Sequence, residues 1–140
     1  MKVRVFGIIY ENEKFHLIRE SNWHFKNQWY FPRDALEENE NVSSGLLREI
    51  KEESGYDAAI NGVCFISYTQ LPLALKGLYI YCSARIIGGT AKLTADENSL
   101  ETKWFTRIEI SHLDIRGNLL EIIQHFDDKL PLMLTDQIHL

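Results

Sequence analysis

Three glutamates lie close together in the segment REIKEESG, which spans positions 48–55. In a helix, Glu49 would lie four positions before Glu53 and three before Glu52, so the three carboxylates would project from one face. Like charges at these spacings cost about 0.2–0.5 kcal/mol per pair, and acids in a last turn oppose the macrodipole by roughly 0.3–1 kcal/mol each. A divalent cation held by the carboxylate oxygens would remove that loss, so the segment predicts a metal site.

A simpler explanation is a solvated acidic face that Arg48 and Lys51 neutralise. Charge runs on helices usually face solvent, and for an isolated Glu-Glu pair this explanation would be preferred. The residues on either side of the segment decide between the two, because their spacing is unusual for a plain surface helix.

That spacing resembles the Nudix box, GX5EX7REUXEEXGU, in which U is a bulky aliphatic or aromatic residue. When Arg48 and Glu49 are placed on the RE of the pattern, other fixed positions are filled by Glu40, Ile50, Glu52, Glu53, Gly55 and Tyr56. The flanks carry residues often found in Nudix hydrolases, namely Trp29, Phe31, Pro32, Glu37 and Val42. A long pattern with most positions filled is far more specific than a short glycine motif.

Two glycine positions of the family differ here, since Asp34 opens the box and Arg33 precedes it. In Nudix hydrolases this turn commonly needs permissive backbone angles, and a carbonyl from it often contacts a metal. Asp34 can adopt a left-handed conformation and could offer its carboxylate, whereas Arg33 is harder to accommodate. Asn39, at another usual Gly position, also tolerates positive φ. Gly45 replaces a usual Ala, which lowers helix propensity by about 1 kcal/mol but allows close approach of another segment.

The resemblance implies an α/β fold, a Nudix-like α/β/α sandwich with a central mixed β-sheet. It also implies that Glu49, Glu52 and Glu53 are catalytic residues that bind Mg²⁺, or alternatively Mn²⁺, with an oxygen of Asp34 as a weaker candidate ligand. Arg48 would join the catalytic set by orienting a box glutamate through a charge-assisted hydrogen bond. A plain helical ion pair between Arg48 and Glu52 explains that arginine nearly as well.

Several other roles stay open. A further acid from a late loop often completes Nudix sites, and Glu97 and Glu101 are both candidates, although either could be a plain surface acid. Glu40 could hold the loop or take part in the site. Four residues could serve the substrate or merely fill the loop and the core: Trp23, His24, Tyr79 and Tyr81.

The composition limits the class of protein and partner. A chain of 140 residues, 45% hydrophobic, can bury one core, and we predict a single domain over 1–140. A net charge of −5 argues against broad nucleic-acid binding. The start of the chain is not secretory and no apolar run could span a bilayer, so a cytoplasmic protein is expected. Cys64 and Cys82 lie in apolar runs and are expected to be buried, reduced thiols.

The pattern of apolar residues predicts the elements. They are a β-hairpin over 2–18 turning at 11–13, an extended piece over 29–31, a helix over 42–54, strands over 58–69 and 77–87, a strand at 103–105 and a helix over 118–127. Asn41 is the predicted N-cap of the first helix and Gly55 its terminator. Pro72 lies in the predicted loop between the two long strands. The apolar stretch 130–134, within the ambiguous tail 130–140, could cover a sheet edge or join a second copy as a homodimer.

These observations favour a Mg²⁺-dependent pyrophosphohydrolase that acts on a small diphosphate, a nucleoside diphosphate linked to another moiety. The alternative is a Nudix-like nucleotide-binding module with weak or no hydrolysis, which the replaced glycines Arg33 and Asp34 suggest. A structural domain with an acidic helix is the third hypothesis. Oxidised nucleotides, ADP-ribose, dinucleoside polyphosphates and sugar nucleotides are all open as substrates.

Overall fold

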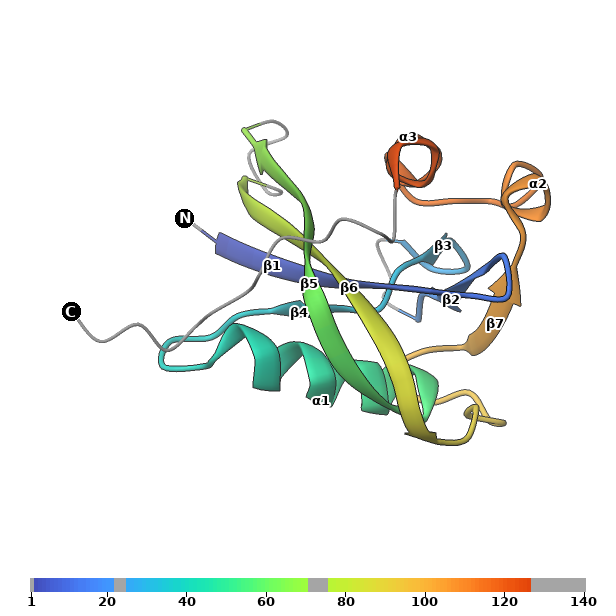
Figure 1. The fold of residues 1–140 in the computed structure, drawn as a ribbon, viewed down its shortest axis with the longest axis horizontal. Coiled ribbons are helices and arrows are strands. Elements are labelled where there is room, and N and C mark those ends of the chain that lie inside the picture. The colour runs from blue at the N-terminus through green and yellow to red at the C-terminus, as the bar shows by residue number, and fades with distance from the viewer. Residues whose placement is uncertain (1, 22–24, 71–75, 127–140) are drawn as a thin grey trace.

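The computed structural model describes residues 2–21, 25–70 and 76–126, and it shows a β-sheet with helices on both sides (Figure 1). The strands are β1 Lys2–Glu11, β2 Lys14–Arg19, β3 Trp29–Tyr30, β4 Arg33–Ala35, β5 Tyr56–Thr69, β6 Gly77–Gly89 and β7 Glu101–Phe105. The helices are α1 Val42–Ser54, α2 Arg107–Ile110 and α3 Leu119–His125. Within the described ranges, every helix is too short or too polar to cross a membrane.

The sheet is mixed. Its strands follow the order β3-β2-β1-β6-β5, with β4 beside β1 and β7 beside β2. Strands β1 and β6 run parallel, with Val5 opposite Ile80, whereas β5 and β6 form a long antiparallel hairpin. The predicted hairpin at the start of the chain is confirmed, and Asn12 and Glu13 at its turn have φ angles of 52° and 64°. Two positive φ values in succession suit the turn that closes a two-residue hairpin.

Each face of the sheet carries its own apolar core. On β1, Val5 and Ile9 pack with Leu46 and Ile50, which lie four positions apart on one apolar face of α1. The neighbouring β1 residues Phe6 and Ile8 instead face the core that α3 covers. Burying one such side chain fully stabilises a fold by roughly 1.5–3 kcal/mol, so the core on each face contributes to the stability of the protein. The predicted α/β/α sandwich with a central mixed sheet is confirmed (Figure 1).

Helix α1 begins and ends where the sequence predicts. Gly55 has a φ of 87° and its N–H donates to the carbonyl of Lys51 at 2.9 Å, which is the expected left-handed cap. A side chain at Gly55 would also place its Cβ 2.3 Å from the carbonyl oxygen of Thr90. Asn41 is extended, as an N-cap should be, but its side chain makes no capping bond, and Ser44 Oγ instead lies 3.5 Å from its carbonyl oxygen.

Two elements are absent from the sequence prediction. Strand β4 has only three residues without apolar alternation, and it forms because it pairs with β1. Helix α2 starts at a capping box between Thr106 and Glu109, a local signal that could have revealed it.

The last predicted helix is confirmed as α3, with Phe126 at its C-cap. The predictions that concern Trp23, His24, Pro72, Asp127 and the tail 130–140 lie outside the described residues. Both cysteines are reduced thiols, as expected, and Cys82 is buried whereas Cys64 is only half-buried.

Candidate active site

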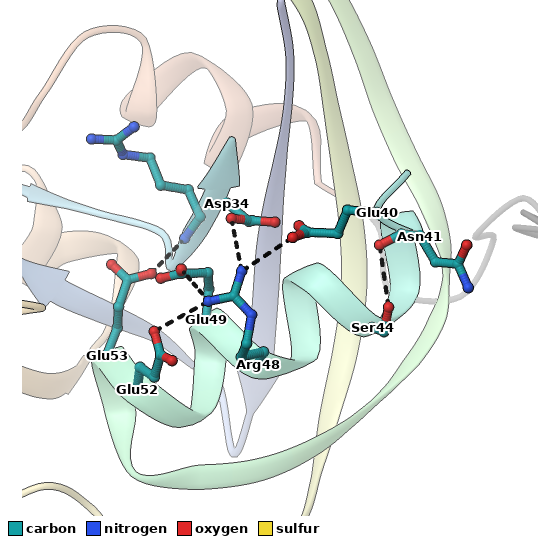
Figure 2. Close-up of polar contacts among 9 residues, drawn as sticks. Asp34, Glu40, Asn41, Ser44, Arg48, Glu49, Glu52 and Glu53 are labelled. Atoms are coloured by element: carbon teal, nitrogen blue, oxygen red, sulfur yellow. Dashed lines mark hydrogen bonds and ion pairs between the residues drawn. The ribbon is translucent and has the colours of Figure 1, made fainter. Parts of the chain in front are cut away.

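Glu53 is the most deeply buried acid of α1. Its side chain points from the last turn toward β4, where Oε1 accepts the backbone N–H of Arg33 at 3.0 Å (Figure 2). The residue is only 5% exposed. Burial raises the pKa of Glu53 well above its ordinary value, although the bond from Arg33 opposes the shift. The fold therefore holds one box carboxylate in a fixed place where the charged form lacks solvent.

Arg48 lies at the centre of an acidic cluster (Figure 2). Its Nη1 lies 2.9 Å from Oε1 of Glu49 and 3.4 Å from Oε2 of Glu52. Its Nη2 lies 3.5 Å from Oδ1 of Asp34 and 3.4 Å from Oε2 of Glu40. The two geometries expected for Arg48, a contact with a box glutamate and the helical pair with Glu52, are thus both present. One half-exposed guanidinium neutralises part of the charge of four carboxylates.

The carboxyl groups of Asp34 and Glu40 both lie close to Gly45 of α1. Each uses one oxygen toward Arg48, and the other oxygens, Oδ2 of Asp34 and Oε1 of Glu40, are buried without a hydrogen-bond donor among the described residues. Burial, followed by the neighbouring Glu40, raises the pKa of Asp34 to about 7, because a protonated Asp34 could donate to Glu40 whereas two charged carboxylates repel each other. A Cβ at Gly45 would lie 2.2 Å from the Glu40 oxygen and 2.5 Å from the Asp34 oxygen. Glycine at 45 therefore makes room for the acid at 34.

The segment at Arg33 and Asp34 does not need glycine, contrary to the expectation of a permissive turn. Neither has positive φ, because both lie in β4, where Asp34 pairs with Val5 of β1. The side chain of Arg33 pairs with buried Glu20 at 3.6 Å. Asn39 has a φ of 69°, as predicted for a residue at a usual Gly position.

Beside these residues lies a cavity of about 380 Å³ that is open to solvent. Its lining residues are Glu20, Ser21, Arg33, Asp34, Ala35, Glu37, Glu49, Glu53, Glu97 and Asn98. Six of these described lining residues are acidic and one is basic. An anionic ligand would be repelled from such a cavity unless cations entered with it.

Some of the predicted site residues line the cavity and others do not. Glu49, Glu53 and Asp34 line the cavity, whereas Glu52 does not belong to the lining and its side chain is 40% exposed. Of the two late acids, Glu97 lines the cavity. Glu101 lies in β7 and pairs with Arg19 at 3.3 Å.

The structure also shows where Tyr79 and Tyr81, the candidate substrate contacts, lie, and it adds Glu20, which was not predicted. Tyr81 is 1% exposed and stacked on Phe6 with ring centroids 4.5 Å apart, so the core explanation is correct for it. Tyr79 packs less deeply against the same ring, at 5.6 Å. Glu20 is 5% exposed and lines the cavity, and it was missed. Its one sequence signal is a charged residue directly after an apolar strand.

The carboxylate oxygens of the described cavity residues are the kind of ligand that a hard divalent cation prefers, but their arrangement does not form a complete coordination shell. Within the described part of the chain, no three acidic, histidine or cysteine side chains converge to hold an ion as they stand. Arg48 accounts for this, because its guanidinium already bridges Asp34, Glu49 and the neighbouring acids. An oxygen of Asp34 is buried without a hydrogen-bond partner among the described residues, and burial raises the pKa of Glu49 and of Glu53. The protein alone therefore stabilises the charged forms of these carboxyl groups poorly, and Mg²⁺ or Mn²⁺ bound to their oxygens would stabilise them.

The NUDIX domain family model matches residues 1–126. The chain belongs to the Nudix family. It is 28% identical over 102 residues to the 8-oxo-dGDP phosphatase of Danio rerio, covering 71% of this chain and 30% of that protein. It is 26% identical over 99 residues to Nudix hydrolase 2 of Arabidopsis thaliana, covering 67% and 34%. The chain thus spans about a third of the length of these relatives.

The fold of this Nudix protein is also that of solved relatives. A NUDIX hydrolase from Nitrosomonas europaea superposes with a TM-score of 0.75 at 23% identity, covering 95% of this chain and 76% of that one. The likeness at such low identity concerns the fold, which is consistent with the mixed sheet and the position of α1.

Proposed function

We propose that this Nudix protein is a Mg²⁺-dependent pyrophosphohydrolase that cleaves a nucleoside diphosphate linked to another moiety. The observation that carries the proposal is the cavity lined by six carboxylates beside the box helix. A diphosphate could lie there only with cations that offset the acidic lining. The 8-oxo-dGDP phosphatase relative supports nucleotides as the substrate class.

Glu49, Glu53 and Asp34 are the proposed ligands within the cavity, and Glu52 could join them from its rim after a side-chain rotation. When bound, Mg²⁺ or Mn²⁺ would supply positive charge to the diphosphate and lower the pKa of water beside it. Arg33 holds Glu53 in place through its backbone N–H, and Arg48 orients Glu49. Glu97 is the proposed proton acceptor, because it lines the same cavity and comes from the loop between β6 and β7 rather than from α1.

The test is an assay of nucleoside diphosphate derivatives with Mg²⁺ or Mn²⁺, comparing the unaltered protein with Glu53→Gln. Loss of one ligand carboxylate should lower kcat by about 100-fold or more, since the cation then lacks its most fixed ligand. Glu101→Gln is the matched control, because that acid lies outside the cavity lining and should leave kcat within about twofold. Metal-independent turnover, or equal rates for the Glu53 variant, would refute the proposal.

The second candidate is a nucleotide-binding module with weak or no hydrolysis. The specific observation in its favour is that Arg48, rather than a convergent set of carboxylates, balances the charge of Asp34 and Glu49. Calorimetry separates the two functions, because a binding module would take up nucleotide in the presence of Mg²⁺ and release no product. The single domain over 1–140 and the cytoplasmic location stay predictions.

A further inference from the structure

The loop of residues 90–100 is fastened to the carboxyl end of α1. The N–H of Lys92 donates to the carbonyl of Ser54 at 2.8 Å, and Ser99 Oγ donates to the carbonyl of Glu53 at 2.7 Å. The last carbonyls of a helix have no partner within the helix, so both bonds satisfy groups that would otherwise need water. The loop therefore adds to the Gly55 cap at the C-terminal end of the helix that carries the box glutamates.

The side chain of Lys92 strengthens this attachment. Its Nζ donates to the carbonyl of Glu52 at 3.2 Å and to Ser99 Oγ at 2.8 Å, and the side chain is only 11% exposed. A cation at the end of a helix is favoured by the helix dipole. Ser99 itself is fully buried. Lys92 and Ser99 bind each other and the carbonyls of two successive box glutamates, and we call this pair the loop latch.

Glu97 lies in the loop between the two latch residues, and its own backbone makes a second attachment. It precedes Ser99 by two positions, and its own carbonyl accepts the hydroxyl of Ser21 at 2.8 Å. Glu97 is an exposed residue that lines the cavity together with Glu53. Because the latch holds the backbone of Glu53 itself, the loop and the box carboxylate are tied at one point.

We propose that Lys92 and Ser99 are positioning residues that fix Glu97 relative to Glu53 for hydrolysis. The inference rests on the proposed function and adds a structural requirement that the box pattern does not contain. Their effect passes through Glu97. When the latch is removed, the end of α1 still keeps the Gly55 cap and the bond from the Arg33 N–H to Glu53, so the carboxylate that is misplaced should be that of Glu97. A displacement of about 1 Å in a reacting group can lower a rate by about 100-fold.

The experiment is a double-mutant cycle on kcat at saturating Mg²⁺ and substrate. Ser99→Ala and Lys92→Met should each lower kcat by about tenfold or more, with KM within about twofold, because they displace Glu97 rather than weaken substrate binding. In a Glu97→Gln background the same substitutions should have almost no further effect. Lys92→Arg keeps the cation and should recover part of the lost rate.

Two matched controls address folding and general effects. Ser111→Ala removes a hydroxyl that donates to a helix carbonyl at the end of α2, and Lys103→Met removes a lysine of β7 that lies over the ring of Phe105. Both should leave kcat within about twofold in either background. Melting curves show which variants are folded, and Lys92→Met keeps the test valid if Ser99→Ala does not fold.

The latch proposal is overturned if its substitutions and Glu97→Gln multiply in the cycle, or if Glu97→Gln leaves kcat unchanged. In either case Glu53→Gln still tests the hydrolase proposal independently. A protein that hydrolyses no diphosphate at all would overturn both.

Discussion

Replacing Gly45 by Ala would test whether this glycine exists for the sake of Asp34. An alanine should stabilise the middle of α1 by about 1 kcal/mol through helix propensity. Its Cβ, however, would lie 2.2 Å from Oε1 of Glu40 and 2.5 Å from Oδ2 of Asp34, whereas ordinary contacts begin near 3.4 Å. Both oxygens would have to retreat by about 1 Å.

The two acids differ in how easily they can move. Glu40 is the longer side chain, is 21% exposed and can rotate toward solvent. Asp34 is 6% exposed on β4, and its retreat would strain the strand or break its contact with Arg48. Overpacking of this kind costs about 1–3 kcal/mol. We therefore expect Gly45→Ala to change the free energy of unfolding by between zero and −2 kcal/mol, despite the gain in propensity.

In an Asp34→Gly background the same alanine should stabilise the protein by about 1 kcal/mol, because the buried acid is gone. Urea denaturation of the four metal-free proteins gives the coupling free energy, which should be about 1–3 kcal/mol. Ser44→Ala, at an exposed position of the same helix, is the control and should add to Asp34→Gly within about 0.5 kcal/mol. A coupling below about 0.5 kcal/mol for Gly45 would refute the idea that Gly45 accommodates Asp34.

Two further predictions concern the acidic cluster. The pKa of Asp34 is raised from 3.8 to about 7 in the folded protein, so its contribution to stability is present below pH 4 and is lost as the pH rises through 7. The free energy of unfolding of the metal-free protein, measured between pH 4 and 8, should show this loss, and the loss should be smaller in Asp34→Asn. A pH slope that Asp34→Asn leaves intact would contradict the assignment. Arg48→Gln should destabilise the metal-free protein by about 0.5–1 kcal/mol, because the four acids around Arg48 lose their counter-charge. For the same reason, adding Mg²⁺ should raise the Tm of this variant more than that of the unaltered protein. An unchanged response to Mg²⁺ would show that Arg48 does not balance the charge of these acids.

Local signals are sufficient for the elements that depend on neighbouring residues. The limits of α1 follow from its apolar stripe and from Gly55, whose left-handed conformation few other residues adopt. The hairpin follows from two apolar runs around Asn12 and Glu13. Strand β4 has no such signal, because its three residues pair with β1 only after the chain has folded back.

The candidate site follows the same division. The box pattern identifies Glu49 and Glu53 because helical spacing relates them directly. Glu20 and Glu97 enter the cavity from distant positions, so only the packed fold shows that they lie beside α1. The relation between Asp34 and Gly45 is likewise invisible in sequence, where each appears as a separate departure from the family pattern.

The central claim is that the acidic cavity beside α1 binds a divalent cation together with a diphosphate. Anomalous diffraction from crystals grown with Mn²⁺ and a non-hydrolysable, methylene-bridged diphosphate would test it most directly. We predict a manganese peak inside the cavity, at roughly 2.0–2.3 Å from carboxylate oxygens of Glu49 and Glu53. A diphosphate bound in the cavity without manganese, or manganese bound only elsewhere, would contradict the claim.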